Sequence, residues 1–393
     1  MRFGLIILVI AINAFIFADA GLVPLGDSDK LDLVYPNQVV EGPDKNIYVY
    51  DAKDSFIKVF SSSGKLLKTI AGPGEGPGYI KREDGVNFGF TLTKLIYISE
   101  YYGGHRWITL LNLEGTLQGT INPQINNPMY GVERIYSIQD GSFLVEFAFA
   151  GLPEKKGAFY LHSAPQAIYH MDANGKLLTK LKETNFFQRI SYFNRGADYG
   201  LPYVPTNLWA PYQNGTILFT DGMDNALKIL NYKGDTIGHI DTELPAVPLV
   251  TVNDLVKWRN FIKKQMTATQ NGKERYEKFG KVIEEYKTPI YKKKPYIHSL
   301  DVTPTGNILI SSLEEPEVNE RNLWLLNSRG KILAQIKSDL SDLKFSLHYI
   351  FIKKRDAEEN MLVYFLNRNS CEDDDFKNLF RCLETFPKNH VSK

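Results

Sequence analysis

The sequence predicts an all-β protein built from one sheet module that is repeated along the chain. The first observation is the segment 46–79, which reads as strand, turn, strand, tight turn and strand. Ile47–Tyr50 and Phe56–Phe60 are rich in β-branched and aromatic residues, which favour strands. The second is that the same order of strands and turns returns along the chain with different letters. The third is composition, since 43% hydrophobic and 23% charged residues are ordinary for a globular protein with a large core.

The tight turn within the module has a recurring chemistry. Ser61 stands three residues before Gly64, and Asn or Asp stands three residues before Gly in the later turns that end at Gly115, Gly175, Gly234 and Gly330. At the first position of a type I turn these side chains hydrogen-bond the backbone, and glycine at the fourth position accepts a positive φ. A strand is expected after each turn.

The first 20 residues are predicted to be a cleavable secretory signal peptide. Arg2 supplies the charged start, an apolar run extends from Leu5 to Phe17, and Ala18-Asp19-Ala20 fits a cleavage site. An uncleaved anchor is the weaker alternative because the run is short for a membrane span. We therefore expect a secreted or periplasmic protein with cleavage near Ala20 and no later transmembrane segment.

Six modules follow, and their spacing favours a β-propeller. The second strand of each module is expected at Ile47, Ile96, Phe143, Ile217, Ile308 and Leu362. The turn glycines are separated by 51, 60, 59 and 96 residues, so the extra residues are assigned to loops, including Ala148 to Pro165. Four-stranded sheets around an axis bury one another's faces, which predicts one six-bladed propeller domain over residues 21–393.

Two stretches carry a resemblance to a known family. IYVYD, IKVF and GKLLKTI followed by GPGEGPGYI resemble the first blade of bacterial exported six-bladed β-propellers with NHL-like repeats, and KKPYIHSLDVTPTGNILI resembles a late blade of that family. The likeness covers roughly Tyr35 to Cys371. It implies the fold and an exported location, and it implies no single activity because propellers serve as binding modules, lactonases and lyases.

A helical hairpin is predicted between blades four and five, over about residues 252–288. Apolar residues recur at helical spacing after a cap expected at Asn253 and again after Gly272. The predicted stripes comprise Leu255, Trp258, Ile262 and Met266 in the first helix and Tyr276, Phe279, Ile283 and Tyr286 in the second. We expect this flap to pack on one mouth or rim of the propeller.

The flap is strongly basic. Residues 252–294 contain twelve Lys and Arg against five Asp and Glu, so a chain of net charge +1 has a basic flap on an acidic body. The binding candidates in it are Trp258, Lys263, Lys264, Lys278 and Lys281. They are interpreted as an ordinary solvated helix surface, and recognition of an anionic partner is the functional alternative.

A polar ring is predicted in the central channel. Asn37, Glu133, Asn207 and His298 each stand ten residues before the expected second strand, and Asn87 and His348 join them if one loop shift is allowed. First strands of blades line the channel, so these side chains are expected to converge. The ring is interpreted as a hydrogen-bonded channel lining, with a calcium site as the alternative.

Carboxylates at strand ends are given a structural interpretation. Asp51, Glu100 and Asp221 each follow the second strand of a blade, where a carboxylate accepts backbone N–H bonds from a loop; metal binding is the alternative. Cys371 and Cys382 are the two cysteines of the chain, and an exported context favours a disulfide between them over a metal site.

The sequence contains no Ser-His-Asp order and no HExxH motif that would indicate an enzyme. We therefore predict a monomeric binding or scaffold module for a protein, peptide or glycan ligand, with no cofactor, and the near-neutral charge gives no reason to expect nucleic acid. The alternative is a calcium-dependent hydrolase or lyase of lactonase-like type with its site in the channel.

Overall fold

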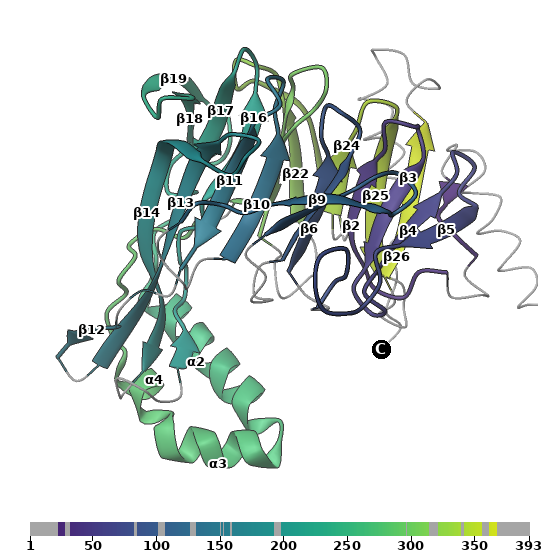
Figure 1. Ribbon diagram of the computed structural model, residues 1–393. Coiled ribbons are helices and arrows are strands. Elements are labelled where there is room, and N and C mark those ends of the chain that lie inside the picture. Colours follow the sequence, from purple (N-terminus) through teal and green to yellow (C-terminus); the bar gives the residue numbers. More distant parts are fainter. Residues whose placement is uncertain are drawn as a thin grey trace, which may run out of the picture.

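The structure is a computed structural model of the 393-residue chain. It describes residues 23–27, 32–81, 85–100, 107–125, 131–149, 151, 153–157, 159–191, 198–295, 297–313, 321–338, 342–355 and 361–367. These residues form six antiparallel sheets, here numbered I to VI, and three helices (Figure 1). The predicted signal peptide and both cysteines, Cys371 and Cys382, lie outside the described residues, so the cleavage and the disulfide stay predictions.

Sheets I and II have four strands each, paired in chain order. Sheet I contains β2 (Pro36–Glu41), β3 (Ile47–Asp51), β4 (Phe56–Phe60) and β5 (Leu66–Ile70). Sheet II contains β6 (Val86–Phe90), β7 (Ile96–Glu100), β8 (Ile108–Leu111) and β9 (Leu117–Ile121). Every residue of β3 and of β7 is buried, because each of these inner strands is covered on both faces.

Sheets IV and V repeat this order. Sheet IV contains β16 (Leu208–Tyr212), β17 (Thr216–Thr220), β18 (Ala226–Asn231) and β19 (Thr236–Asp241). Sheet V contains β20 (Ile297–Val302), β21 (Ile308–Ser312), β22 (Arg321–Leu326) and β23 (Ile332–Ser338).

Sheet VI joins the two ends of the described chain. It consists of β24 (Asp342–Phe345), β25 (Tyr349–Arg355), β26 (Met361–Asn367) and the N-terminal β1 (Val23–Pro24). β1 is the outermost strand of this sheet, and its Val23 pairs with Phe365. The prediction that Leu362 belongs to a second strand was wrong, because β26 pairs on both sides and is the third strand; β25 is the second.

Sheet III is longer than the others. It contains β10 (Gly131–Ser137), β11 (Phe143–Ala148), β12 (Pro153–Lys156), β13 (Phe159–Met171), β14 (Leu177–Ser191) and β15 (Asp198–Gly200). The loop predicted from Ala148 to Pro165 was wrong: β12 and the first half of β13 occupy much of it, paired from Pro153↔His162 to Lys156↔Phe159. The glycines, prolines and charged residues of this stretch favoured a loop in the sequence, whereas the segment forms an extension of the β13–β14 hairpin.

The inserted segment forms α2 (Val252–Thr267), α3 (Gln270–Phe279) and α4 (Lys281–Glu285), between β19 and β20. Two details differ from the prediction of a two-helix hairpin. The first helix begins after Thr251, whose side chain and Asp254 form a reciprocal capping box, and not at Asn253. The second helical stretch is divided at Gly280 into α3 and α4.

The predicted tight turns are confirmed. In each, the glycine N–H donates to the carbonyl three residues earlier, as in Gly64 to Ser61 and Gly115 to Asn112. The φ values of the five turn glycines lie between 79° and 87°. Asn112 Oδ1 accepts from the N–H groups of Glu114 and Thr116, at 3.0 and 2.8 Å, which is the mechanism expected from the sequence.

Hydrophobic clusters join each sheet to the next and the last sheet to the first. Residues that share a cluster across these junctions include Tyr50 with Phe88 (I and II), Ile108 with Phe147 (II and III), Leu144 with Trp209 (III and IV), Leu218 with Ile310 (IV and V), Leu325 with Ile352 (V and VI) and Phe365 with Val49 (VI and I). The described sheets therefore pack as a closed ring, the arrangement of a β-propeller.

Among the described helices, none has both the length and the apolar character that a membrane span requires.

Candidate functional site

The first strands of neighbouring sheets lie side by side, with β2 next to β6, β6 next to β10 and β16 next to β20, so they form the innermost layer. Three predicted ring residues are the extra residue of a β-bulge in this layer. Asn37 falls between the paired Pro36 and Gln38, Glu133 between Val132 and Arg134, and His298 between Ile297 and Ser299. Asn207 directly precedes β16. The equal offset in sequence therefore corresponds to one register position, where a bulge redirects the side chain.

The backbone carbonyls at this position connect neighbouring sheets. Lys353 Nζ donates to the carbonyl of Asn37 at 2.8 Å, and Asn87 Nδ2 donates to that of Glu133 at 2.6 Å. Arg134 Nη2 donates to the carbonyl of Asn207 at 2.6 Å. In each case a side chain of one sheet satisfies a backbone group of the next. These bonds use backbone carbonyls and not the side chains of the predicted ring, so the convergence of those side chains in a channel stays a prediction.

Asn87 and His348 do not share the register of the other four. Asn87 pairs with Ser99 on a strand without a bulge, at the position that Arg134 occupies opposite Glu146. His348 lies in the turn between β24 and β25, where its N–H donates to Glu41 Oε2 at 2.9 Å and its Nδ1 contacts the same carboxylate. Placing His348 in the ring was wrong, because the alignment of the last module was displaced by one strand.

Around Glu133 the structure places a polar cluster between sheets III and IV, here called the inner acidic cluster. Its members are Glu133, Arg134, Glu146, Gln166 and Asn207. Arg134 Nε lies 3.3 Å from Glu146 Oε2, and the guanidinium side chain is 26% exposed whereas Glu146 is fully buried. Asn207 Nδ2 donates to Gln166 Oε1 at 2.9 Å, and Gln166 Nε2 donates to Glu133.

The two carboxyl groups of this cluster have raised pKa values. Burial raises the pKa of Glu146 to about 7; Arg134 opposes this shift, and the negative charge of Glu133 adds to it. Burial also raises the pKa of Glu133, against the charge of Arg134 and the hydrogen bond from Gln166. Trp209 Nε1 donates to Glu146 Oε2 at 2.8 Å, which favours the charged form. The Arg134 guanidinium is thus the positive charge that stabilises the ionised forms of both carboxyls in a poorly solvated site.

The sequence interpretation missed Arg134, Glu146, Gln166 and Trp209. A signal for one of them was present, since Glu146 interrupts the apolar strand FLVEF at the position held by Tyr50, Ser99, Thr220 and Ser311 in other sheets. A carboxylate inside an otherwise buried strand requires a partner. Arg134, Gln166 and Trp209 carried no such signal, because their convergence depends on how sheets III and IV pack.

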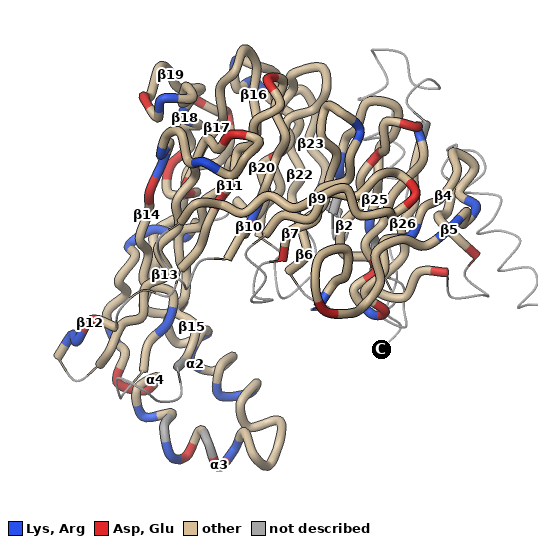
Figure 2. The backbone as a smooth tube through the Cα atoms, viewed as in Figure 1, with Lys and Arg blue, Asp and Glu red and all other residues tan. Residues whose placement is uncertain are grey.

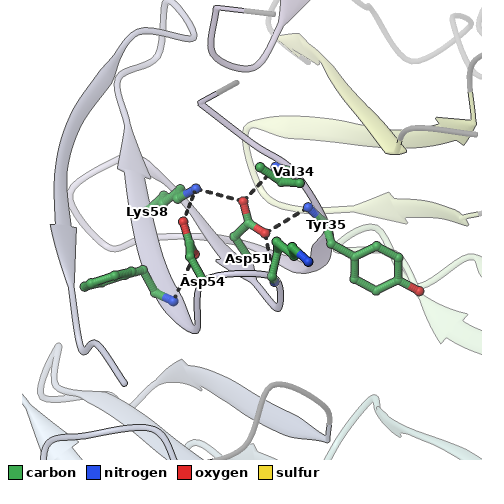
Figure 3. A network of polar contacts seen from close by, with 7 residues as sticks. Val34, Tyr35, Asp51, Asp54 and Lys58 are labelled. Carbon is green, nitrogen blue, oxygen red and sulfur yellow. Dashed lines mark hydrogen bonds and ion pairs between the residues drawn. The ribbon is translucent and has the colours of Figure 1, made fainter. Parts of the chain in front are cut away.

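The strand-end carboxylates are hydrogen-bonded within the fold. Asp51 accepts from the N–H groups of Val34 and Tyr35, each at 2.8 Å, and from Lys58 Nζ at 2.8 Å (Figure 3). Burial alone would raise the pKa of Asp51, but the bonds from Lys58 and the two N–H groups outweigh it and hold this pKa below its ordinary value. These contacts match the structural interpretation of Asp51.

Glu100 and Asp221 have comparable contacts. Glu100 Oε1 accepts from the N–H of Lys81 at 2.8 Å, and Asp221 Oδ1 accepts from the N–H of Met223 at 3.0 Å. Among the described residues, no three His, Cys, Asp or Glu side chains are grouped as a metal site would require.

A second candidate site is the projection, defined as α2–α4 with the part of the β13–β14 hairpin that extends beyond the other sheets, together with β12 and β15. Figure 1 shows these elements at the far end of the long hairpin. Their core includes Leu161 and Ile190 from the hairpin and Leu255, Val282 and Ile283 from the helices. The helices therefore pack on the hairpin extension, which differs from the predicted packing on a mouth or rim of the propeller.

The flap candidates occupy this projection in different ways. Trp258 is half-buried against Tyr286, with ring centroids 5.4 Å apart. Lys263 lies 3.9 Å from Glu284, and Lys281 lies 3.7 Å from Glu285. The remaining candidates, Lys264 and Lys278, are exposed. Figure 2 shows Lys and Arg along these helices.

Comparison with solved structures supports the fold. A member of the DUF4221 family from Bacteroides vulgatus has a TM-score of 0.50 at 12% identity, covering 88% of this chain and 95% of that chain. A Bacteroides fragilis protein described as exported has a TM-score of 0.49 at 11% identity, with coverages of 88% and 95%. Virginiamycin B lyase from Staphylococcus aureus has a TM-score of 0.43 at 11% identity, with coverages of 88% and 98%. The ring of packed sheets, together with the likeness to the Bacteroides vulgatus structure, gives the chain a β-propeller-like fold. No protein-family model and no curated protein matches the sequence.

Proposed function

We propose that this chain is an exported six-bladed β-propeller that acts as a binding module and recognises a protein, peptide or glycan ligand through its basic projection. The six described sheets are the blades, and α2–α4 are an insertion between blades four and five. The observation that carries the proposal is the projection itself. It extends one blade far beyond the length that sheet packing requires and gives it a separate core.

The charge of the projection favours an anionic ligand. Its helical segment and the following strand connection, residues 252–294, contain twelve basic and five acidic residues. Three of the acids, Asp254, Glu284 and Glu285, pair with Lys294, Lys263 and Lys281. Because the bases outnumber the acids, a positive potential remains over α2 and α3 that would attract carboxylate or sulfate groups.

Exposed apolar side chains accompany this charge. Val252 is 76% exposed and Phe261 is 55% exposed, both on α2, the helix that also buries Leu255. Apolar and aromatic side chains beside cations are common in recognition surfaces, since they add contact area to the attraction between charges. The projection therefore combines a rigid base with an exposed surface suited to binding.

The test replaces three exposed lysines of the projection, Lys264, Lys273 and Lys278, by glutamine. Poly-L-glutamate serves as the peptide probe and polygalacturonate as the glycan probe. The triple variant should bind the preferred probe at least tenfold more weakly than the unaltered chain, and raising NaCl from 50 to 200 mM should weaken binding because exposed charges are screened.

The matched control carries the same charge change on the propeller, through Lys65→Gln, Lys176→Gln and Lys233→Gln in exposed turns. It should retain affinity within about twofold of the unaltered chain, by the argument that distant exposed charges contribute little at moderate salt. Equal losses in both variants, or no binding of either polyanion, would overturn the assignment of the projection as an anion-recognising surface.

The calcium-dependent hydrolase or lyase remains the second candidate function. One observation favours chemistry at the channel, namely the partly exposed carboxyl of Glu133, whose pKa is raised by burial, since a carboxyl with a raised pKa suits proton transfer. Calcium retained in stoichiometric amount after dialysis would favour this candidate over the binding module.

A further inference from the structure

The inner acidic cluster has an excess of hydrogen-bond acceptors. Glu133 accepts from Gln166 Nε2, which directs Gln166 Oε1 toward Asn207 and requires Asn207 to present Nδ2 to it. Asn207 Nδ2 also donates to Thr184. With Glu133 ionised, these bonds set the orientation of both amides and leave Asn207 Oδ1 without a donor in the described structure.

A second oxygen in the cluster is in the same position. Glu146 Oε2 accepts from Trp209 and lies beside Arg134, whereas Glu146 Oε1 has no donor within hydrogen-bond distance among the described residues, although Asn207 lies close enough to help lower the pKa of Glu146. Glu146 is fully buried and Asn207 is 1% exposed, so bulk water does not reach either oxygen. Buried acceptors without partners are rare in folded proteins, because each has lost its hydrogen bonds to water without replacing them.

The cluster also lacks positive charge. Glu133 and Arg134 come from β10 and Glu146 from β11, while Gln166 from β13 and Asn207 from the start of sheet IV are neutral. Among the described residues, Arg134 is the one cation whose charge acts on either carboxyl. Two further titratable groups lie near this region, namely Tyr136 on β10 and Asp301 on β20. Besides burial, the negative charges of Asp301 and Glu146 both raise the pKa of Tyr136. Neither Tyr136 nor Asp301 supplies a positive charge.

We propose that the inner acidic cluster binds one cationic nitrogen group, an ammonium or a guanidinium, that approaches from the channel and contacts Glu133. Glu133 is partly exposed, so the group reaches it first, and the fully buried Glu146 behind it supplies the second negative charge. The N–H groups of the ligand donate to Glu133, and its positive charge offsets the two carboxylates that share Arg134. This ligand class is separate from the anionic ligand of the projection, and neither proposal depends on the other.

A divalent metal ion fits this arrangement less well. Calcium takes six to eight oxygen ligands, whereas here the Arg134 guanidinium lies 3.3 Å from a carboxylate oxygen and repels a doubly charged ion more than a singly charged one. In the empty site a proton on Glu146 reduces the charge imbalance, because the pKa of this carboxyl is about 7. A bound cation would favour the ionised carboxylate, so binding should release a proton and strengthen as the pH rises through about 7.

The test uses the full chain and the indole N–H resonance of Trp209, which bonds Glu146 and is identified by its loss in Trp209→Phe. Methylammonium and methylguanidinium chloride are titrated at pH 5.5 and pH 8. We expect a saturable shift with at least one of them and an apparent affinity at least tenfold higher at pH 8. The better probe distinguishes an ammonium from a guanidinium ligand. Tetramethylammonium, which has the charge but no N–H donor, should give no saturable shift.

Two variants localise the effect. Glu133→Gln should weaken amine binding at least tenfold, whereas Glu183→Gln, on the exposed carboxylate that pairs with Lys180, should leave it unchanged. Equal shifts with tetramethylammonium, a saturable response to CaCl₂ at lower concentration than to either amine, or an indole that responds to pH but not to amines would each overturn the proposal. If Glu133→Gln fails to fold, the pH dependence and the tetramethylammonium arm on the unaltered chain decide.

Discussion

The ring of sheets and the projection are stabilised in different ways. Each sheet of the ring buries side chains against two neighbours, and sheet VI joins the N-terminal β1 to β26, so a defect in one sheet is felt by the next. The projection depends on one cluster between its helices and one hairpin. Damage to the ring should therefore lower the stability of the whole chain, whereas damage to the projection should stay local.

The largest expected effect is in the ring, from Asp51→Ala. The Lys58 side chain is 7% exposed and would lose one of its carboxylate partners, while the N–H groups of Val34 and Tyr35 would lose their acceptor. Breaking a buried ion pair from one side destabilises by about 3–5 kcal/mol. Urea unfolding of the full chain measures this loss.

The matched control for this change is Asp54→Ala. Asp54 also pairs with Lys58, at 2.7 Å, but its side chain is 38% exposed, so its loss should destabilise by at most about 1 kcal/mol. Equal losses for the two variants would show that burial of the carboxylate at Asp51 does not strengthen its effect on stability.

A smaller and local effect is expected from Leu255→Ala in the projection. Leu255 is buried in the helix–hairpin core, and truncation of a buried leucine removes about 2–5 kcal/mol of packing. Hydrogen exchange should accelerate in α2–α4 while β3 and β7 stay protected. The same change in the ring, Leu325→Ala, should accelerate exchange in the sheets as well. A uniform response to Leu255→Ala would show that the projection and the ring unfold together.

The last effect concerns pH and is expected in the ring of sheets. The pKa of Glu146 is about 7 in the folded chain against an ordinary 4.5, so between these values the folded chain keeps a proton that the unfolded chain has lost. The free energy of unfolding should therefore fall as the pH rises from 4.5 to about 7, by up to about 3.5 kcal/mol at ~1.4 kcal/mol per pKa unit, and the contribution should be level above that.

Glu146→Gln removes this titration and should flatten the dependence, as measured by urea unfolding at pH 5, 6, 7 and 8. Glu183→Gln, on the exposed side of β14, is the control and should keep the slope of the unaltered chain. An unchanged slope in Glu146→Gln would assign the pH dependence to another group.

The sequence determined the repeated module because its signals are local. Alternating β-branched and aromatic residues produce the strands, and the contacts of Asn112 with the N–H groups two and four residues later produce the turn that ends at Gly115. Helical periodicity located α2 for the same reason. The register of Asn37, Glu133 and His298 was also readable, since a bulge is fixed by the count of residues between turn and strand.

Tertiary structure decided what depended on distant parts of the chain. β1 completes sheet VI by pairing with β26, so the last module contained one strand fewer in sequence than its sheet has in space, and Leu362 and His348 were misplaced. The insertion found its packing partner in a hairpin extension that turn residues had disguised as a loop. Glu146 could be suspected from its apolar strand, but its partners Arg134 and Trp209 are brought to it by the packing of sheet III on sheet IV, because the energy of a buried charge depends on neighbours that no local pattern specifies.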